Sequence, residues 1–153
     1  MTIAPIVQTV VVAAPPERAF ALFTASMGRW WARGRTIGAK PHAEVVVEPY
    51  AGGRWFERDD DGVETQWGKV LAWEPPGRVL FGWQIDASFS FDPDLLTEVE
   101  VTFHPEGAGT RVTLIHRDLE RFGESAERVA AQLAGGWPGF IQLYAQFVEG
   151  GQA

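Results

Sequence analysis

The chain has 153 residues, of which 46% are hydrophobic and 22% charged, a composition typical of a soluble globular domain. Its formal net charge of -7 and its scattered basic residues argue against nucleic acid and anionic membranes as partners, because both favour clustered positive charge. The absence of cysteine excludes disulfides, thiolate metal sites and a cysteine nucleophile. We expect one cytoplasmic domain over residues 1–153, without a signal peptide or a membrane-spanning helix.

The N-terminal half of the chain predicts one strand, two short helices and then several more strands. A β-branched run over residues 6–12 predicts the first strand, which Pro15 and Pro16 end. Apolar residues at helical spacing predict a helix after Pro16, and a short second helix carries Trp30 and Trp31. Six further strands, separated by turns rich in Gly, Pro and Asp, are predicted over residues 43–48, 54–58, 63–73, 78–85, 96–104 and 110–117.

The C-terminal part of the chain predicts helical structure in two pieces. Residues 125–133 form the first, and Gly135, Gly136 and Pro138 then interrupt it. Because proline fits the first turn of a helix better than its interior, we expect a new helix to begin near Pro138. Its apolar residues recur three and four positions apart and form one stripe: Trp137, Phe140, Ile141, Tyr144, Phe147 and Val148.

Together these elements predict an α+β fold. Consecutive strands joined by short turns form a strongly curved antiparallel sheet of six to seven strands. The long C-terminal helix is the main amphipathic element left to cover the concave face, and the two short helices close one end. The gap between a curved sheet and a single helix is a place where a binding pocket forms.

The seven tryptophans, with ten Phe and two Tyr, are the most informative feature of the sequence. Tryptophan is seldom buried completely, because its size and its N–H favour a cavity wall or an interface. We therefore predict a cavity that binds a small apolar or aromatic molecule, with Phe89 and Phe91 covering it; the alternative is an aromatic core without a ligand. The predicted ligand-binding residues are Trp30, Trp31, Trp67, Trp83, Phe89, Phe91, His116, Trp137, Ile141 and Tyr144.

No established catalytic or metal-binding motif is present in the sequence. His116 shares the strand parity of Val112 and Leu114, so it should face the helix, where it could orient a ligand, act as a general base or be an ordinary satisfied polar group. The histidines and carboxylates lack metal-ligand spacing, and no serine lies in a nucleophile-elbow context. We expect no metal and no cofactor, and we assign no catalytic residue.

Six segments in order resemble a known family: VVVAAPPERAFALFT, MGRWW, YAGGRWFE, WGKVLAWEPPGRVLFGW, EVEVTFHPEGAGTRVTLIHR and GGWPGFIQLYAQF. The chain resembles bacterial proteins related to the activator of heat-shock-protein-90 ATPase, in the START-like (SRPBCC, helix-grip) superfamily. That resemblance implies the helix-grip fold and, in many members, a hydrophobic cavity. It does not imply one activity, because the superfamily includes lipid carriers, aromatase/cyclases and hydrolases.

Three functions remain open on the sequence. The first is binding of a small hydrophobic or aromatic molecule without chemistry, and the second is a cyclase or hydrolase in which His116 or a tyrosine supplies a proton. The third is a protein-interaction domain, with a chaperone partner or a second copy of the chain, which requires exposed tryptophans and an apolar patch. The family's eukaryotic co-chaperone carries a further N-terminal domain for which this chain has no room, so a chaperone partner is disfavoured.

Overall fold

The computed structural model describes residues 2–150. The elements follow one another as β1 (Ile6–Val12), α1 (Pro16–Thr24), α2 (Met27–Trp30), β2 (His42–Val47), β3 (Arg54–Asp59), β4 (Glu64–Glu74), β5 (Arg78–Trp83), β6 (Thr97–Glu106), β7 (Gly109–Arg117), a 3-10 helix (Leu119–Ser125) and α3 (Ala126–Glu149). The predicted α+β class and order of elements are confirmed, and strand ends differ from the prediction by at most two residues. No helix within residues 2–150 is both long and apolar enough to cross a membrane.

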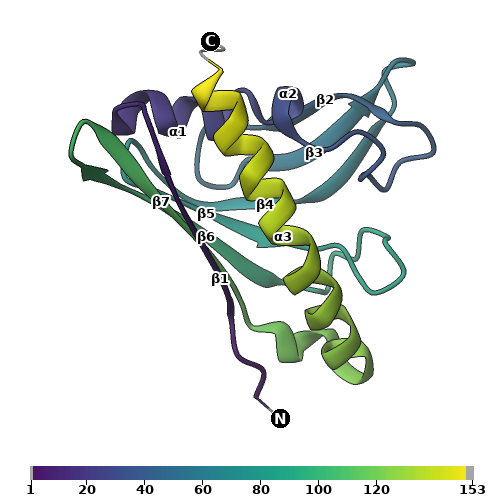
Figure 1. Cartoon of the computed structure of the whole chain (residues 1–153). Coiled ribbons are helices and arrows are strands. Elements are labelled where there is room, and N and C mark those ends of the chain that lie inside the picture. Colours follow the sequence, from purple (N-terminus) through teal and green to yellow (C-terminus); the bar gives the residue numbers. More distant parts are fainter. Residues whose placement is uncertain (1, 151–153) are drawn as a thin grey trace.

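All seven strands form one antiparallel sheet in the order β1-β7-β6-β5-β4-β3-β2. α3 crosses the inner face of this sheet, and α1 and α2 lie at one end of it (Figure 1). The backbones of β4 and β5 approach so closely at Gly68 that an added Cβ would lie 1.8 Å from the carbonyl oxygen of Gly82. Only glycine fits at that position, where the register is also irregular.

The alternation of side chains along β6 decides which residues face the helix. Thr97, Val99, Val101 and Phe103 are buried on the inner face, whereas Glu98 and Glu100 lie on the outer face. Both glutamates form ion pairs with Arg117. The prediction that one face of this strand is polar and faces solvent is confirmed. A polar outer face and an apolar inner face place the core between the sheet and α3.

The predicted break before Pro138 is wrong, because α3 is one helix of 24 residues with Pro138 in its interior. Proline inside a helix costs about 3 kcal/mol and each glycine about 1 kcal/mol relative to alanine. The packing of Trp137, Ile141 and Tyr144 against the inner face of the sheet outweighs these local costs. Burial of one continuous stripe therefore keeps the helix intact across its weakest segment.

Two glycines of α3 are not required by packing. Neither Gly135 nor Gly139 has a positive φ, and a Cβ built at either meets nothing within 4 Å. We predict that Gly135→Ala and Gly139→Ala each stabilise the protein by about 0.5–1 kcal/mol, because alanine restricts the unfolded chain and favours helix. Urea unfolding midpoints measure the effect. Gly68→Ala is the control and should be strongly destabilised, and destabilisation by either helix substitution would contradict the prediction.

Candidate functional site: an aromatic cavity beside the C-terminal helix

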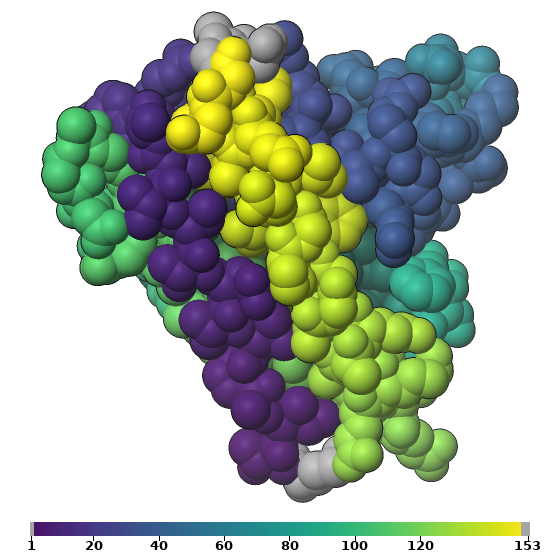
Figure 2. All heavy atoms as spheres, viewed as in Figure 1, coloured from purple at the N-terminus to yellow at the C-terminus, as the bar shows by residue number. Residues whose placement is uncertain are grey.

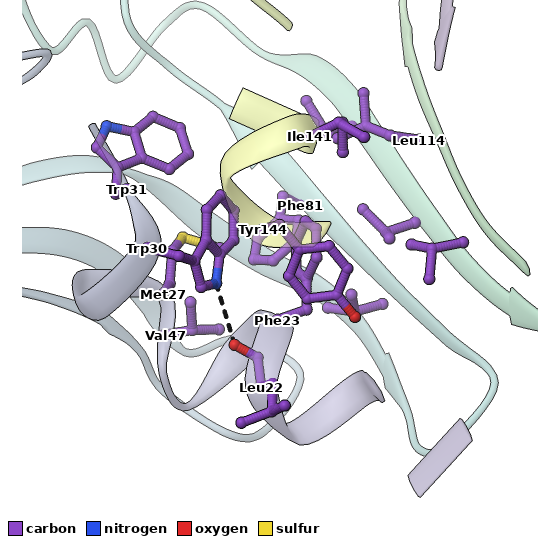
Figure 3. Packing of buried hydrophobic residues seen from close by; sticks show 14 of the residues in the cluster. Leu22, Phe23, Met27, Trp30, Trp31, Val47, Phe81, Leu114, Ile141 and Tyr144 are labelled. Carbon is purple, nitrogen blue, oxygen red and sulfur yellow. Dashed lines mark hydrogen bonds between the residues drawn. The ribbon is translucent and has the colours of Figure 1, made fainter. Parts of the chain in front are cut away.

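The buried aromatic rings divide into two groups. The first packs tightly between α1, α2 and the C-terminal half of α3, and Figure 3 shows Trp30, Phe23, Phe81 and Tyr144 gathered there with Trp31 at the edge. Its ring centroids are 5.0 Å apart for Phe23 and Tyr144 and 5.5 Å for Trp30 and Tyr144. These are ordinary edge-to-face core contacts. The first group is therefore solid core.

The second group surrounds a cavity of about 540 Å³ beside the N-terminal half of α3. Two loops, residues 31–41 and 84–96, lie on the same side of α3 (Figure 2). Residues of both loops line the cavity. A volume of this size is in the range of small-molecule binding sites. The lining residues are Trp31, Gly34, Arg35, Thr36, Ile37, Trp67, Trp83, Ile85, Asp86, Ala87, Phe89, Val129, Gln132, Leu133, Gly136, Trp137 and Phe140.

The four tryptophans of the cavity all donate their indole N–H groups to acceptors within the protein. Trp31 donates to the carbonyl of Arg35 at 2.9 Å, and Trp83 to that of Ile85 at 3.1 Å. The other two donate to buried side chains, Trp67 to Glu57 and Trp137 to His116. Because every indole N–H already has an acceptor, these walls offer a ligand apolar ring surface rather than hydrogen bonds.

Half of the predicted ligand-binding residues line the cavity, namely Trp31, Trp67, Trp83, Phe89 and Trp137. Trp30, Ile141 and Tyr144 do not, because they face the packed half of the core. Phe91 is half-buried outside the cavity, where its backbone bridges to Ile85. His116 faces inward, as its parity predicted, but it lies behind Trp83 and Trp137 with no exposed surface.

Sequence analysis missed the polar lining and one aromatic residue. Phe140 lines the cavity, and its position three residues after Trp137 on the apolar stripe was an available signal. Its ring centroid lies 4.3 Å from that of Trp31. Arg35, Thr36, Asp86 and Gln132 come from loops and from the exposed side of α3, and no periodic pattern marks such positions.

Phe89 stands at the mouth of the cavity and is 62% exposed, the most exposed large hydrophobic side chain among the described residues. It has a positive φ of 59°, a conformation that is rare outside glycine. The Asp86 carboxylate fixes this turn by accepting the N–H groups of Ser88 and Ser90. The covering role predicted for Phe89 stays a prediction.

His116 belongs to a buried chain of hydrogen bonds that fixes which of its ring nitrogens carries the proton. Trp137 donates to Nδ1 at 3.1 Å, so Nε2 carries the proton and faces Thr97 Oγ1 at 2.8 Å. Burial lowers the pKa of His116 from 6.5 to about 3. Its ring is neutral, both nitrogens are occupied, and it does not reach the cavity, so it is not placed to act as a general base on a ligand.

Tyr144 is equally unsuited to proton transfer. Its hydroxyl donates to the carbonyl of Ala19 at 2.7 Å, and burial raises the pKa of this phenol. The enzyme hypothesis required His116 or a tyrosine to supply a proton to the ligand. Neither His116 nor Tyr144 is suited to that role. Within residues 2–150 no cluster of three His, Asp or Glu side chains is arranged to hold a metal ion.

We predict that His116 makes the protein less stable in acid. Its folded-state pKa of about 3 lies below the unfolded value of 6.5, so between these values the unfolded chain binds the extra proton. Stability is therefore lost as the pH falls below 6.5, on the order of 2 kcal/mol by pH 5. Urea unfolding of the wild type and His116→Gln from pH 7 to pH 5 measures the difference. The variant should show a flatter profile, and parallel profiles would contradict the prediction.

The family described as Activator of Hsp90 ATPase homolog 1-like protein matches residues 13–149. The chain is similar to the anthrahydroquino-gamma-pyrone synthase Txn09, solved in complex with SUM, at 38% identity over 95% of this chain and 97% of that one, with a TM-score of 0.67. No curated protein matches.

Two further solved structures share the fold. CalC of Micromonospora echinospora, a self-sacrificing resistance protein, is 27% identical over 98% of this chain and 97% of that one, with a TM-score of 0.74. The Aha1 dimer of Colwellia psychrerythraea is 16% identical over 99% and 100%, with a TM-score of 0.68, and shows the fold alone. Both structures share the curved antiparallel sheet and the long C-terminal helix of this chain. The chain belongs to the Activator of Hsp90 ATPase homolog 1-like family, within the START-like helix-grip superfamily.

Proposed function

We propose that this protein binds a planar, polycyclic aromatic molecule in the cavity beside α3. The observation that carries the proposal is the cavity itself: about 540 Å³ walled by Trp31, Trp67, Trp83 and Trp137. Flat ring surfaces with satisfied N–H groups favour stacking and edge-to-face contact with another aromatic system. The 38% identity over nearly the full length to a synthase named for an anthrahydroquinone product supports the same class of ligand.

The polar groups of the site support binding of a molecule with an apolar body and a polar end. Arg35, Thr36, Asp86 and Gln132 line the cavity together with the aromatic walls. Few polar groups around a largely apolar volume are typical of sites that orient one ligand. The exposed Phe89 would cover part of a bound molecule at the mouth.

A chaperone-interaction role finds less support in the described surface. None of the seven tryptophans is exposed, and the exposed large hydrophobic residues are divided among β1, three loops and α3. The protein-interaction hypothesis required exposed tryptophans and one contiguous apolar patch. The small-molecule hypothesis is therefore preferred.

We predict that Gly136→Leu abolishes ligand binding without unfolding the protein. Gly136 lines the cavity from α3, and a Cβ there meets only the Phe140 ring edge, at 4.0 Å, so a leucine side chain would fill the ligand's space. Gly135→Leu, one position along the helix and outside the cavity, is the matched control. Tryptophan fluorescence titrated with 2-methoxyanthraquinone measures affinity.

A loss of at least tenfold in affinity is expected in Gly136→Leu, with wild-type affinity in Gly135→Leu and unchanged or higher unfolding midpoints in both. Equal affinity in both variants would show that the probe binds elsewhere. No binding to the wild type would contradict the proposed ligand class.

Ring closure on the bound molecule is the second candidate function, and the similarity to Txn09 is the observation that favours it. Since His116 and Tyr144 do not reach the cavity, the protein would act mainly by holding two reacting groups together. We predict conversion of an anthrahydroquinone bearing a phenol beside a 1,3-dicarbonyl side chain, with loss of one water as the ring closes. Mass spectrometry follows the loss. A rate equal to that in Gly136→Leu would contradict catalysis.

A further inference from the structure

Within residues 2–150, Arg35 is the arginine whose guanidinium makes no ion pair, hydrogen bond or ring contact. Six other arginines pair with carboxylates, namely Arg54, Arg58, Arg78, Arg111, Arg117 and Arg121. Arg33, on the same loop as Arg35, donates to the carbonyl of His42 at 2.9 Å. Arg35 is therefore left unpaired, although acidic residues outnumber basic ones by 20 to 13.

Arg35 lies on the 31–41 loop and belongs to the lining of the cavity beside α3. Its backbone carbonyl accepts the indole N–H of Trp31 at 2.9 Å, which holds the residue at the edge of that ring. The ring centroid of Trp31 lies 4.3 Å from that of Phe140 and 4.9 Å from that of Trp67, and all three line the cavity. A flat molecule that contacts these rings therefore has Arg35 beside its rim.

The chemistry of the guanidinium matches an anionic oxygen. Its five N–H donors form a planar fork that binds a carboxylate through two parallel hydrogen bonds, and it stays charged at any physiological pH. The Arg35 side chain is exposed, so water solvates this charge when the cavity holds no ligand. An arginine that no carboxylate of the chain occupies is available to a ligand without the loss of an existing ion pair.

Asp86 is the other charged residue of the lining, and it lies on the 84–96 loop. No ion pair joins Asp86 to Arg35 within residues 2–150. The Asp86 Oδ1 atom accepts the backbone N–H groups of Ser88 at 2.9 Å and Ser90 at 3.1 Å, so this carboxylate already has a role in its own loop. Of the two lining charges, the cation is thus the one without a partner.

Resting on the proposed function, we propose that the ligand is an acid, and that the Arg35 guanidinium binds its anionic oxygen at the mouth of the cavity. The oxygen belongs to a carboxylate or an ionised phenol on the rim of the aromatic system. The tryptophan walls hold the rings and do not distinguish charge, because their N–H groups are already used. Arg35 therefore decides which end of the molecule stays at the mouth.

The test compares anthraquinone-2-carboxylate with anthraquinone-2-carboxamide at neutral pH, by titration of tryptophan fluorescence. The two probes have nearly the same size and shape and differ by one charge. The wild type should bind the carboxylate about fivefold more tightly, as expected for a charged hydrogen bond at a partly exposed site. In Arg35→Gln this preference should fall to about twofold or less.

Arg111→Gln is the matched control for the loss of one positive charge. Arg111 is an exposed residue of β7 that pairs with Glu106 and does not line the cavity. Because salt screens charges that lie beyond about 8 Å, the preference of this variant should equal that of the wild type.

Asp86→Asn tests the same inference with the opposite sign. The amide oxygen of asparagine can still accept the N–H groups of Ser88 and Ser90, while the negative charge at the mouth is removed. The preference for the carboxylate should rise by about twofold, because the anion no longer meets a like charge. This variant also keeps the inference testable if Arg35→Gln fails to fold, which thermal unfolding shows.

Equal binding of both probes to the wild type, or tighter binding of the carboxamide, overturns the role of Arg35 and leaves the proposed function standing. A preference that survives in folded Arg35→Gln, that disappears in Arg111→Gln, or that does not rise in folded Asp86→Asn also overturns it. If neither probe binds the wild type, the proposed function and this inference both fail.

Discussion

The hydrogen bond from Trp137 to His116 attaches α3 to the sheet at the point where the helix is weakest. Gly135, Gly136, Pro138 and Gly139 surround Trp137 and disfavour helix locally. The same indole packs against Trp83 and Phe140 on the cavity side. If Trp137 did not hold this segment, the helix would be free to bend and the cavity would have no fixed wall. Trp137 therefore belongs both to the packed core and to the cavity wall.

The position of the cavity follows from how unevenly the inner face of the sheet is covered. α1 and α2 fill the space at one end, where Phe23, Trp30 and Tyr144 pack with ring centroids 5.0–5.5 Å apart. At the other end the loops over residues 31–41 and 84–96 lie beside α3, and the cavity remains between these loops, the sheet and the helix. Trp30 and Trp31 mark the division, because consecutive residues at the end of α2 turn into the solid half and the hollow half respectively.

Two buried polar residues near the cavity show how different roles arise from similar burial. His116 has both nitrogens bonded and a pKa of about 3, so it is an inert neutral link between sheet and helix. Glu57 has one oxygen bonded three times and the other left without a partner. A fully satisfied group is explained by the fold, whereas a half-satisfied group implies a missing partner.

The amino-acid sequence by itself determined the helix-grip architecture and the inner face of the sheet, because alternation along β6 and the stripe of α3 are local periodic patterns. It did not determine whether α3 continues through Pro138, since the local preference for a break is outweighed by burial that only the folded sheet provides. It predicted an aromatic cavity but only part of its lining, because Trp30 and Tyr144 share periodicity with residues that line the cavity and yet face the packed core. The free oxygen of Glu57 was decided by tertiary structure alone. Its three donors come from the 31–41 loop and from β4, and no sequence pattern records which atoms a fold brings together across such distances.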